Sequence, residues 1–446
     1  MAGRSLSNRL KDKLIQQAIE RKIKRNEDEG ESSRKNPLQE SLDIPSSFYR
    51  FDQHPGYKQM QIINKGAEQL GIENPFFRVH DGIAGATTTI EGRSYINFAS
   101  YNYLGLSGDQ RVSNAAKMAI DRYGTSVSAS RLVSGERPIH HELESALADA
   151  YKVDDAVVLV SGHATNVTTI GYLFGNKDLI IHDELAHNSI LMGAQLSGAR
   201  RLSFPHNDYA ALDKILTEQR RNYERVLVVI EGLYSMDGDY PNLPEFISIK
   251  QKHHVFLMVD EAHSFGVMGS HGLGIREHFG VDGKDVDIWM GTLSKALAGC
   301  GGFIAGESAL IEHIKFLVPG FLYSVGSPPQ VIASCLEALK IIKREPERVQ
   351  RLQTLSKYFL AKAKAAGIDT GLSQGIAIIA AITGSSQSAA RLSIALFEHG
   401  INVQPIMYPV VPEKSARLRF FLSSEHTEEQ IDETIKLFME EWRKVR

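Results

Sequence analysis

The chain has 446 residues, of which 43% are apolar and 23% are charged, a globular composition that excludes disordered or collagen-like structure for most of its length. Fifty Lys and Arg residues stand against 53 Asp and Glu residues, so the net charge is −3 and there is no basic excess of the kind that nucleic acid requires. The length predicts two or three folded units.

Two cysteines, Cys300 and Cys335, are too few for a disulfide framework and indicate a reducing compartment. The N-terminus has no apolar stretch of the signal-peptide kind, and uncharged stretches such as 156–176 contain Gly, Ser and His, unlike a membrane span. We therefore predict a cytoplasmic protein that binds neither membranes nor nucleic acid.

Residues 1–35 carry ten Lys and Arg against six Asp and Glu. Apolar residues between Leu10 and Ile23 recur at helical spacing, and the polar stretch 26–37 is typical of a linker. We interpret 1–55 as a basic helix and linker, which is either a solvated arm or a docking helix for a partner.

Between residues 56 and 330, short β-rich apolar runs alternate with helical stretches. Most runs are apolar at every position, which predicts strands buried on both faces of a mainly parallel sheet, with helical crossovers between them. This pattern predicts a large domain of the α/β class. The clearest strands are 156–160, 179–182, 226–230, 255–259 and 286–290.

The pattern changes after Pro328-Pro329. We expect residues 331–446 to form a smaller C-terminal α+β domain. Its last helix should begin after Thr427, because a Thr followed by two Glu residues is a good helix N-terminus. The other expected elements are helices over 331–343, 346–366 and 389–399 and strands over 376–382 and 417–422.

Polar groups follow three predicted strands, at the carboxyl edge where a parallel sheet places its active site. Asp260 and His263 follow one strand. Lys295 follows another, among small residues and the hydroxyls of Thr292 and Ser294. Crowding and partial burial favour loss of the lysine proton, which makes the amine nucleophilic.

The segment 161–166, Ser-Gly-His-Ala-Thr-Asn, follows a third strand, and a glycine turn that opens a helix is a ready phosphate site. Each feature has an ordinary alternative: a helix cap or ion pair for Asp260, a surface loop for Lys295, a plain turn for 161–166. Together, a lysine that can form an imine, a strand-end aspartate and a phosphate site are what pyridoxal phosphate (PLP) requires.

From about Ile96 to the C-terminus, an ordered series of motifs resembles the α-oxoamine synthases, which are PLP-dependent enzymes of fold type I. That family includes 8-amino-7-oxononanoate synthase, glycine C-acetyltransferase, 5-aminolevulinate synthase and serine palmitoyltransferase. The motifs in this chain are YNYLGL (101–106), SRLVSG (130–135), SGHATN (161–166), DELAHNSI (183–190), EGLYSMDGD (231–239), VDEAHSFGVMGSHGLG (259–274), GTLSKALAGCGG (291–302), YSVGSPP (323–329) and ARLRFFLS (416–423).

The resemblance implies the fold-type-I architecture and assigns roles at the cofactor. Lys295 would form the covalent imine and later move the proton on the substrate Cα. Asp260 would pair with the pyridine nitrogen, and His263 would hydrogen-bond the phenolic oxygen. His187 would stack on the cofactor ring, and Ser235 would lie beside the phenolic oxygen.

The resemblance also implies groups for the phosphate and for the amino acid, and no metal. Arg417 would bind the amino-acid carboxylate, a bidentate task that suits arginine. Tyr101 and Asn102 would approach that carboxylate, in this family usually from the other subunit of a homodimer. The phosphate would be held by Ser161, Gly162, His163, Thr292 and Ser294.

Two positions depart from the family pattern. His163 stands where an aromatic residue is common. The loop 323–329 lacks the Thr that usually reaches the phosphate of the neighbouring subunit, and Ser324 or Ser327 could replace it.

The implied reaction is a decarboxylative condensation of a small α-amino acid with an acyl thioester, which yields an α-amino ketone, CO2 and free thiol. The donor would be acyl-CoA or an acyl-carrier protein. Ser130, where glycine-specific aminolevulinate synthases have Thr, predicts room for a side chain at Cα. The rivals are a catalytically silent partner subunit, against which Lys295, Asp260 and His263 argue, and an aminotransferase or β-eliminating enzyme of the same fold.

Overall fold

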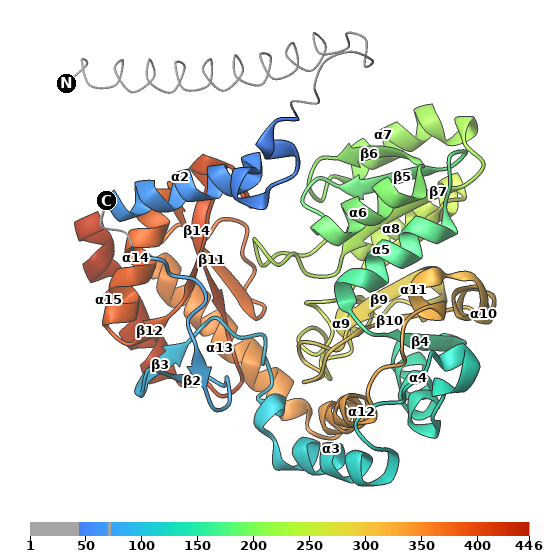
Figure 1. Cartoon of the computed structure of the whole chain (residues 1–446), viewed down its shortest axis with the longest axis horizontal. Helices are drawn as coiled ribbons and strands as arrows, with labels where there is room; N and C mark the ends of the chain where they lie inside the picture. The colour runs from blue at the N-terminus through green and yellow to red at the C-terminus, as the bar shows by residue number, and fades with distance from the viewer. Residues whose placement is uncertain (1–43, 70–72, 446) are drawn as a thin grey trace. The chain divides into compact units, whose positions relative to one another are not determined.

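The computed structural model describes residues 44–69 and 73–445 (Figure 1). The predicted basic helix and linker, at 10–23 and 26–37, lie outside the described residues. The chain divides between residues 72 and 73 into two compact units. The described part of the first unit has two short helical turns, η1 (Ser46–Phe48) and η2 (Phe51–Gln53), followed by helix α2 (Pro55–Gln69).

The second unit contains a seven-stranded sheet in the order β4-β10-β9-β8-β7-β5-β6 (Figure 1). All pairs from β9 to β6 are parallel, and β10 is antiparallel to β9 and β4. The predicted mainly parallel sheet is confirmed. The strands are β4 (Asp155–Leu159), β5 (Leu179–Asp183), β6 (Arg200–Phe204), β7 (Val226–Glu231), β8 (Phe256–Asp260), β9 (Ile288–Thr292) and β10 (Gly302–Gly306).

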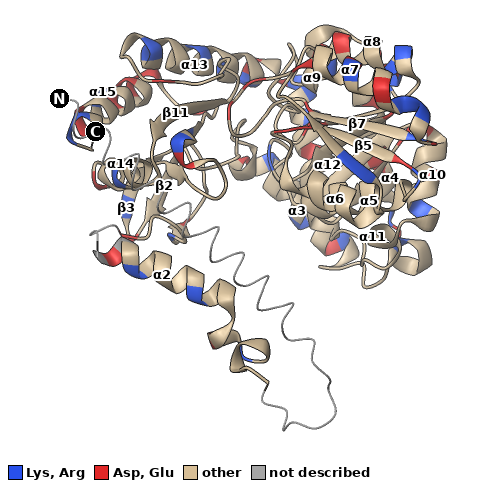
Figure 2. Ribbon diagram, turned by 90° about the horizontal axis from the view of Figure 1, so that it is seen from above, with Lys and Arg blue, Asp and Glu red and all other residues tan. Residues whose placement is uncertain are grey.

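Apart from the edge strand β6, the strands are mostly apolar because both faces of this sheet are covered. In β7, Val226, Val228 and Ile230 enter one hydrophobic cluster, while Leu227 and Val229 enter another. Successive side chains of a strand point to opposite faces, so the two clusters lie on the two faces of the sheet. Charged residues of both signs lie mainly on the helices (Figure 2).

Helices connect the strands as predicted for crossovers in a parallel sheet. Helices α5 and α6 pack against each other, and α12 packs against α3 and α4. The helices of this part are α3 (Gln110–Tyr123), α4 (Pro138–Tyr151), α5 (Gly162–Leu173), α6 (Asn188–Ser197), α7 (Tyr209–Gln219), α8 (Leu243–His253), α9 (Gly274–Phe279), α10 (Ser308–Leu317), α11 (Pro319–Leu322) and α12 (Pro329–Arg344).

The C-terminal part is the predicted α+β arrangement, with a three-stranded antiparallel sheet in the order β11-β14-β13. Helix α15 begins after Thr427 as predicted: the Thr427 hydroxyl accepts from the Gln430 N–H, and the Gln430 side chain accepts from the Thr427 N–H, a reciprocal cap. The elements are α13 (Pro346–Ala365), β11 (Ile378–Gly384), α14 (Ser386–Glu398), β13 (Gln404–Ile406), β14 (Ala416–Phe421) and α15 (Glu428–Val445).

A further four-stranded sheet, β1-β2-β3-β12, joins residues far apart in the sequence. Strand β3 pairs in parallel with β12, so Ile96 faces Ile401. A strand from the predicted large domain therefore pairs with a strand from the predicted C-terminal domain, across the boundary predicted at 330/331. The predicted domain limits, 1–55, 56–330 and 331–446, stay a prediction. The strands are β1 (His80–Asp81), β2 (Thr87–Ile90), β3 (Arg93–Asn97) and β12 (Ile401–Asn402). None of the described helices has the length and apolarity needed to cross a membrane.

Candidate active site

A cavity of about 210 Å³ lies at the carboxyl edge of the large sheet. Residues that follow β4, β5, β7, β8 and β9 reach it, because these strands all end at the same edge. Ten of the residues predicted from the sequence meet here. The lining consists of Tyr101, Ser161, Gly162, His163, Asn166, His187, Ser189, Glu231, Asp260, Ala262, His263, Met290, Thr292, Ser294 and Lys295.

Lys295 follows β9, and its Nζ lies 5.7 Å from the centre of the Tyr101 ring. Burial lowers the pKa of Lys295 to about 8, although the negative charges of Asp260 and Glu231 act in the opposite direction. A lysine with this pKa is partly a free amine near neutral pH, which is the nucleophilic form.

Asp260 ends β8 with both carboxylate oxygens engaged by donors. Its Oδ2 accepts from Asn166 Nδ2 at 2.7 Å, and its Oδ1 accepts from the backbone N–H of Ala262 at 2.9 Å. Glu231 occupies the neighbouring register position on β7. Burial, and then the charge of Asp260, raise the pKa of Glu231 well above its usual value.

His263 is held by aromatic neighbours. Its Nδ1 lies 2.8 Å from the hydroxyl of Tyr103, and its ring is parallel to that of Phe421, with centres 6.3 Å apart. Burial lowers the pKa of His263 well below its usual value, and the positive charge of Lys295 adds to this. His263 is therefore a neutral hydrogen-bonding group.

The N-terminus of α5 approaches the turn after β9 closely. The Ser161 hydroxyl caps the helix by accepting from the Ala164 N–H at 3.3 Å. A Cβ at Gly162 would lie 2.9 Å from Thr292 Oγ1, so only glycine fits this approach. The Thr292 hydroxyl donates to the Gly301 carbonyl at 2.9 Å, while the first amides of α5 stay available for an anion.

Four predicted residues do not line this cavity. Ser130 and Ser235 are outside the lining, and Asn102 lines an adjoining cavity of about 360 Å³ that also reaches Lys295. Arg417 is also outside it: its guanidinium donates to Asp237 Oδ1 at 2.5 Å and to the carbonyls of Met236 and Ser415, both at 2.9 Å.

Arg419, two positions further on β14, is a residue that sequence reasoning missed. Its Nη1 donates to the Ser235 carbonyl at 3.1 Å, and its Nε has no hydrogen-bond partner among the described residues. Burial is the largest cause of the lowered pKa values of Lys295 and His263, and the positive charge of Arg419 is a further cause of both. The motif ARLRFFLS contains both arginines, and the prediction from the sequence named only Arg417.

The expectation that Tyr101 and Asn102 approach the site from a second subunit stays a prediction. Tyr101 lies beside Lys295 of its own chain. The segment that carries it is tied to the C-terminal part, because the Phe98 N–H donates to the Asn402 carbonyl at 2.8 Å and the Ser423 hydroxyl donates to the Asn102 carbonyl at 3.1 Å.

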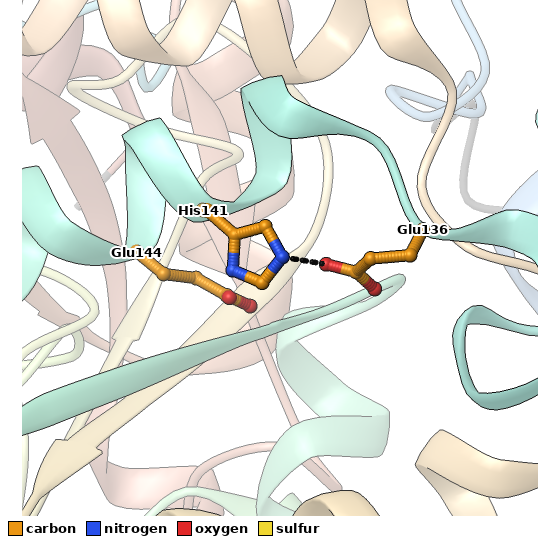
Figure 3. A group of neighbouring side chains, drawn as sticks. All are labelled: Glu136, His141 and Glu144. Atoms are coloured by element: carbon orange, nitrogen blue, oxygen red, sulfur yellow. Dashed lines mark ion pairs between the residues drawn. The ribbon is translucent and has the colours of Figure 1, made fainter.

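Away from the cavity, Glu136, His141 and Glu144 converge from α4 and the turn before it, a grouping that resembles a metal site (Figure 3). Both carboxylates are already acceptors for the guanidinium of Arg131, and Glu144 also accepts from the Val158 N–H at 2.8 Å. The oxygens therefore serve a buried ion pair, and we assign no metal to them.

Comparisons with known proteins agree with the site. The family described as "Aminotransferase class I and II" matches residues 93–438. An 8-amino-7-oxononanoate synthase of Fervidobacterium nodosum is 41% identical over 383 residues, which cover 85% of this chain and 96% of the relative. The chain belongs to the α-oxoamine synthases. A second 8-amino-7-oxononanoate synthase, of Symbiobacterium thermophilum, is 39% identical over 84% of this chain and 94% of its own length.

Solved structures place the synthase in the same group. The serine palmitoyltransferase of Sphingomonas wittichii superposes with a TM-score of 0.84 at 30% identity, covering 88% of this chain and 98% of that one. An 8-amino-7-oxononanoate synthase of Francisella tularensis gives a TM-score of 0.69 at 27% identity, covering 78% and 98%. The predicted fold type, PLP dependence and decarboxylative condensation of an amino acid with an acyl thioester are confirmed.

The cavity of this synthase fits PLP. Asp260 offers a carboxylate for the pyridine N–H, Lys295 offers an amine of lowered pKa, and the end of α5 at Gly162 offers backbone amides to a phosphate. These are the three groups that the cofactor requires of a protein.

Proposed function

We propose that this synthase condenses alanine, or another small α-amino acid, with an acyl-CoA. The observation that carries the proposal is Lys295, an amine with a pKa of about 8, placed in one cavity with Asp260 and the end of α5. When bound, PLP supplies the electron sink for negative charge at the substrate Cα.

The chain's own residues would then hold and move protons. Lys295 would carry the Cα proton, and Asp260 would accept the pyridine N–H, which keeps that nitrogen protonated. The neutral His263 would hydrogen-bond the phenolic oxygen, and His187 would lie against the ring. The role of Ser235 beside that oxygen rests on the resemblance alone, because Ser235 is outside the lining. Hydroxyls and backbone amides of Ser161, Gly162, His163, Thr292 and Ser294 would hold the phosphate.

We assign the amino-acid carboxylate to Arg419 in place of Arg417. Arg417 already has three acceptors, one of them the carboxylate of Asp237. Arg419 keeps Nε unpartnered among the described residues and lies near Lys295. A buried donor without a partner is costly unless a ligand satisfies it, and a carboxylate suits the guanidinium geometry.

The name of the closely matching relatives supports alanine. The product 8-amino-7-oxononanoate has an amine beside a ketone and a methyl group next to the amine, which is what alanine leaves after losing its carboxylate. The other end of that product is a carboxylate, so the acyl group would come from a dicarboxylic thioester. The prediction from Ser130 also allows a side chain at Cα, although it rests on the family position alone.

A product assay tests the proposal. Gly, Ala and Ser labelled in the carboxyl group would each be offered with monocarboxylic and dicarboxylic acyl-CoA. We expect CO2, free thiol and α-amino ketone in equal amounts, with the highest kcat/KM for alanine. A keto acid without thiol release would indicate an aminotransferase, and no turnover with any pair would indicate a silent subunit; either result contradicts the proposal.

An acyl-carrier protein is the second candidate donor. The family profile begins at residue 93, and the separate first unit exposes apolar side chains such as Phe48, Phe51 and Ile62, which a partner protein could cover. The predicted basic arm at 1–35 would steer an acidic carrier. If so, a chain beginning at residue 73 should lose turnover with the carrier-bound acyl group and keep turnover with acyl-CoA.

We also propose that the synthase is a cytoplasmic homodimer. A helical turn, η4 (Arg131–Gly135), and the neighbouring segment 323–325 expose apolar side chains: Val133 is 80% and Tyr323 is 86% exposed, and a β-bridge between Ser130 and Val325 joins the two segments. The cytoplasmic location is supported by the two cysteines, which are both free thiols, as is usual in a reducing compartment. We expect light scattering to give twice the molar mass of the chain, and Val133→Asp to give the single chain. A wild-type monomer at working concentration would contradict the dimer.

A further inference from the structure

A chain of hydrogen bonds joins Asp260 to His187 through two residues with no assigned role. Asn166 Nδ2 donates to Asp260 Oδ2 at 2.7 Å and to Ser189 Oγ at 2.9 Å. Ser189 Oγ in turn lies 2.7 Å from His187 Nδ1. Asn166 is 1% exposed and Ser189 is 0% exposed, so water does not compete for these contacts.

The direction of each hydrogen bond follows from the groups involved. A carboxylate only accepts, so Asn166 presents its NH2 to Asp260 and gives its second hydrogen to Ser189. The hydroxyl hydrogen of Ser189 is then free to point at His187. The backbone N–H of Ser189, which can only donate, also points at His187 Nδ1, at 3.3 Å. Both contacts require a lone pair on Nδ1, so the ring proton is on Nε2.

The surrounding charges favour the same form of the ring. Burial lowers the pKa of His187; the charge of Asp260 opposes this, while the remaining charged neighbours add to it. The Glu231 carboxyl accepts the backbone N–H of His187 at 2.5 Å, and its own pKa is raised. The groups that face His187 are Asp260, Glu231, Lys295, His163 and Arg419.

We propose that Ser189 and Asn166 are positioning residues, which hold His187 as a neutral imidazole with its proton on Nε2 and tie that ring to Asp260. The inference rests on the proposed function, in which His187 lies against the cofactor ring. Such a ring offers the cavity one donor for a carbonyl or carboxylate oxygen. It also leaves the Cα proton to Lys295, because Nδ1 is already occupied by donors.

One atom of this hydrogen-bond network is unsatisfied within the described part of the chain. The Asn166 Oδ1 is buried and has no partner among the described residues, and an unsatisfied buried acceptor is unfavourable. A residue that only filled space would not need an amide here. The orientation of Asn166 is explained by its two acceptors, Asp260 and Ser189.

The test is the pKa of His187 in the full-length chain, with and without PLP. Of the two forms of an imidazole, diethyl pyrocarbonate modifies the neutral one, so its rate at His187, assigned by mass spectrometry of peptide fragments that separate His187 from His182 and followed from about pH 5 to about pH 9, gives this pKa. In Ser189→Ala we expect the pKa to rise by about 0.5 to 1, because the neutral ring loses one donor. Ser189→Thr keeps a hydroxyl and should stay near wild type.

Ser385→Ala is the matched control. Ser385 caps α14, and its hydroxyl accepts from the Ser388 N–H at 3.0 Å and lies 2.9 Å from the Ser388 hydroxyl, so this variant also removes a serine hydroxyl and its hydrogen bonds at a helix N-terminus, but away from the cavity. An unchanged His187 pKa in Ser189→Ala, or an equal rise in Ser385→Ala, would overturn the inference. The measurement uses no amino acid or thioester, so its failure leaves the proposed condensation standing.

Discussion

Replacing Lys295 by alanine should reduce condensation by about 10³-fold or more, because the group that would carry the Cα proton is lost. The variant should also lose the visible band of lysine-bound PLP and the reaction of that band with borohydride. Absorbance spectra and the thiol-release assay measure the two effects. Lys284→Ala is the control, since Lys284 is an exposed lysine paired with Asp154 at 2.7 Å, and it should change neither.

The pH dependence of PLP uptake provides a second readout for Lys295. Only the free amine attacks the cofactor aldehyde, and the pKa is about 8. The rate at which the PLP-free chain takes up PLP should therefore rise with pH up to about 8 and level off above it. A rate that keeps rising toward pH 10, the range of an ordinary lysine, would show that burial does not lower this pKa.

Arg419→Lys should raise the KM for the amino acid by about 10- to 100-fold, because a lysine cannot make two parallel hydrogen bonds to a carboxylate. The thioester KM should change little, since that substrate brings no carboxylate to this position. Steady-state kinetics with each substrate varied in turn separates the two constants.

Arg417→Lys is the matched comparison on the same strand. It disturbs the ion pair with Asp237, so we expect a lower Tm and an amino-acid KM close to that of wild type. If Arg417→Lys raises the KM and Arg419→Lys does not, the original sequence prediction is right and the assignment to Arg419 is wrong.

The large sheet is predictable from the sequence because its signal is local. A run such as Val226–Ile230 is apolar at every position, and only burial on both faces explains that pattern. Asp260 and Lys295 follow such runs directly, so their placement at the carboxyl edge needs no knowledge of strand order. The order of motifs then supplied the family and, with it, the chemistry.

Other features depend on residues distant in the chain. Strand β10 has glycine at both ends and pairs with β9 and β4 in the antiparallel sense, which its own five residues do not indicate. Strand β3 finds its partner at Ile401, far along the sequence. The segment after this pairing carries Tyr101, which lies beside Lys295 of its own chain.

The sequence by itself determined the fold class, the cofactor chemistry and the residues that end the strands. Only the tertiary structure distinguishes the surroundings of Arg417 from those of Arg419, which lie on one face of the same strand and in the same motif. Asp237 pairs with Arg417, and no nearby acidic residue in the motif forecasts this. Asp237 is far from Arg417 in the sequence, and only long-range packing brings its carboxylate to this arginine and not to Arg419.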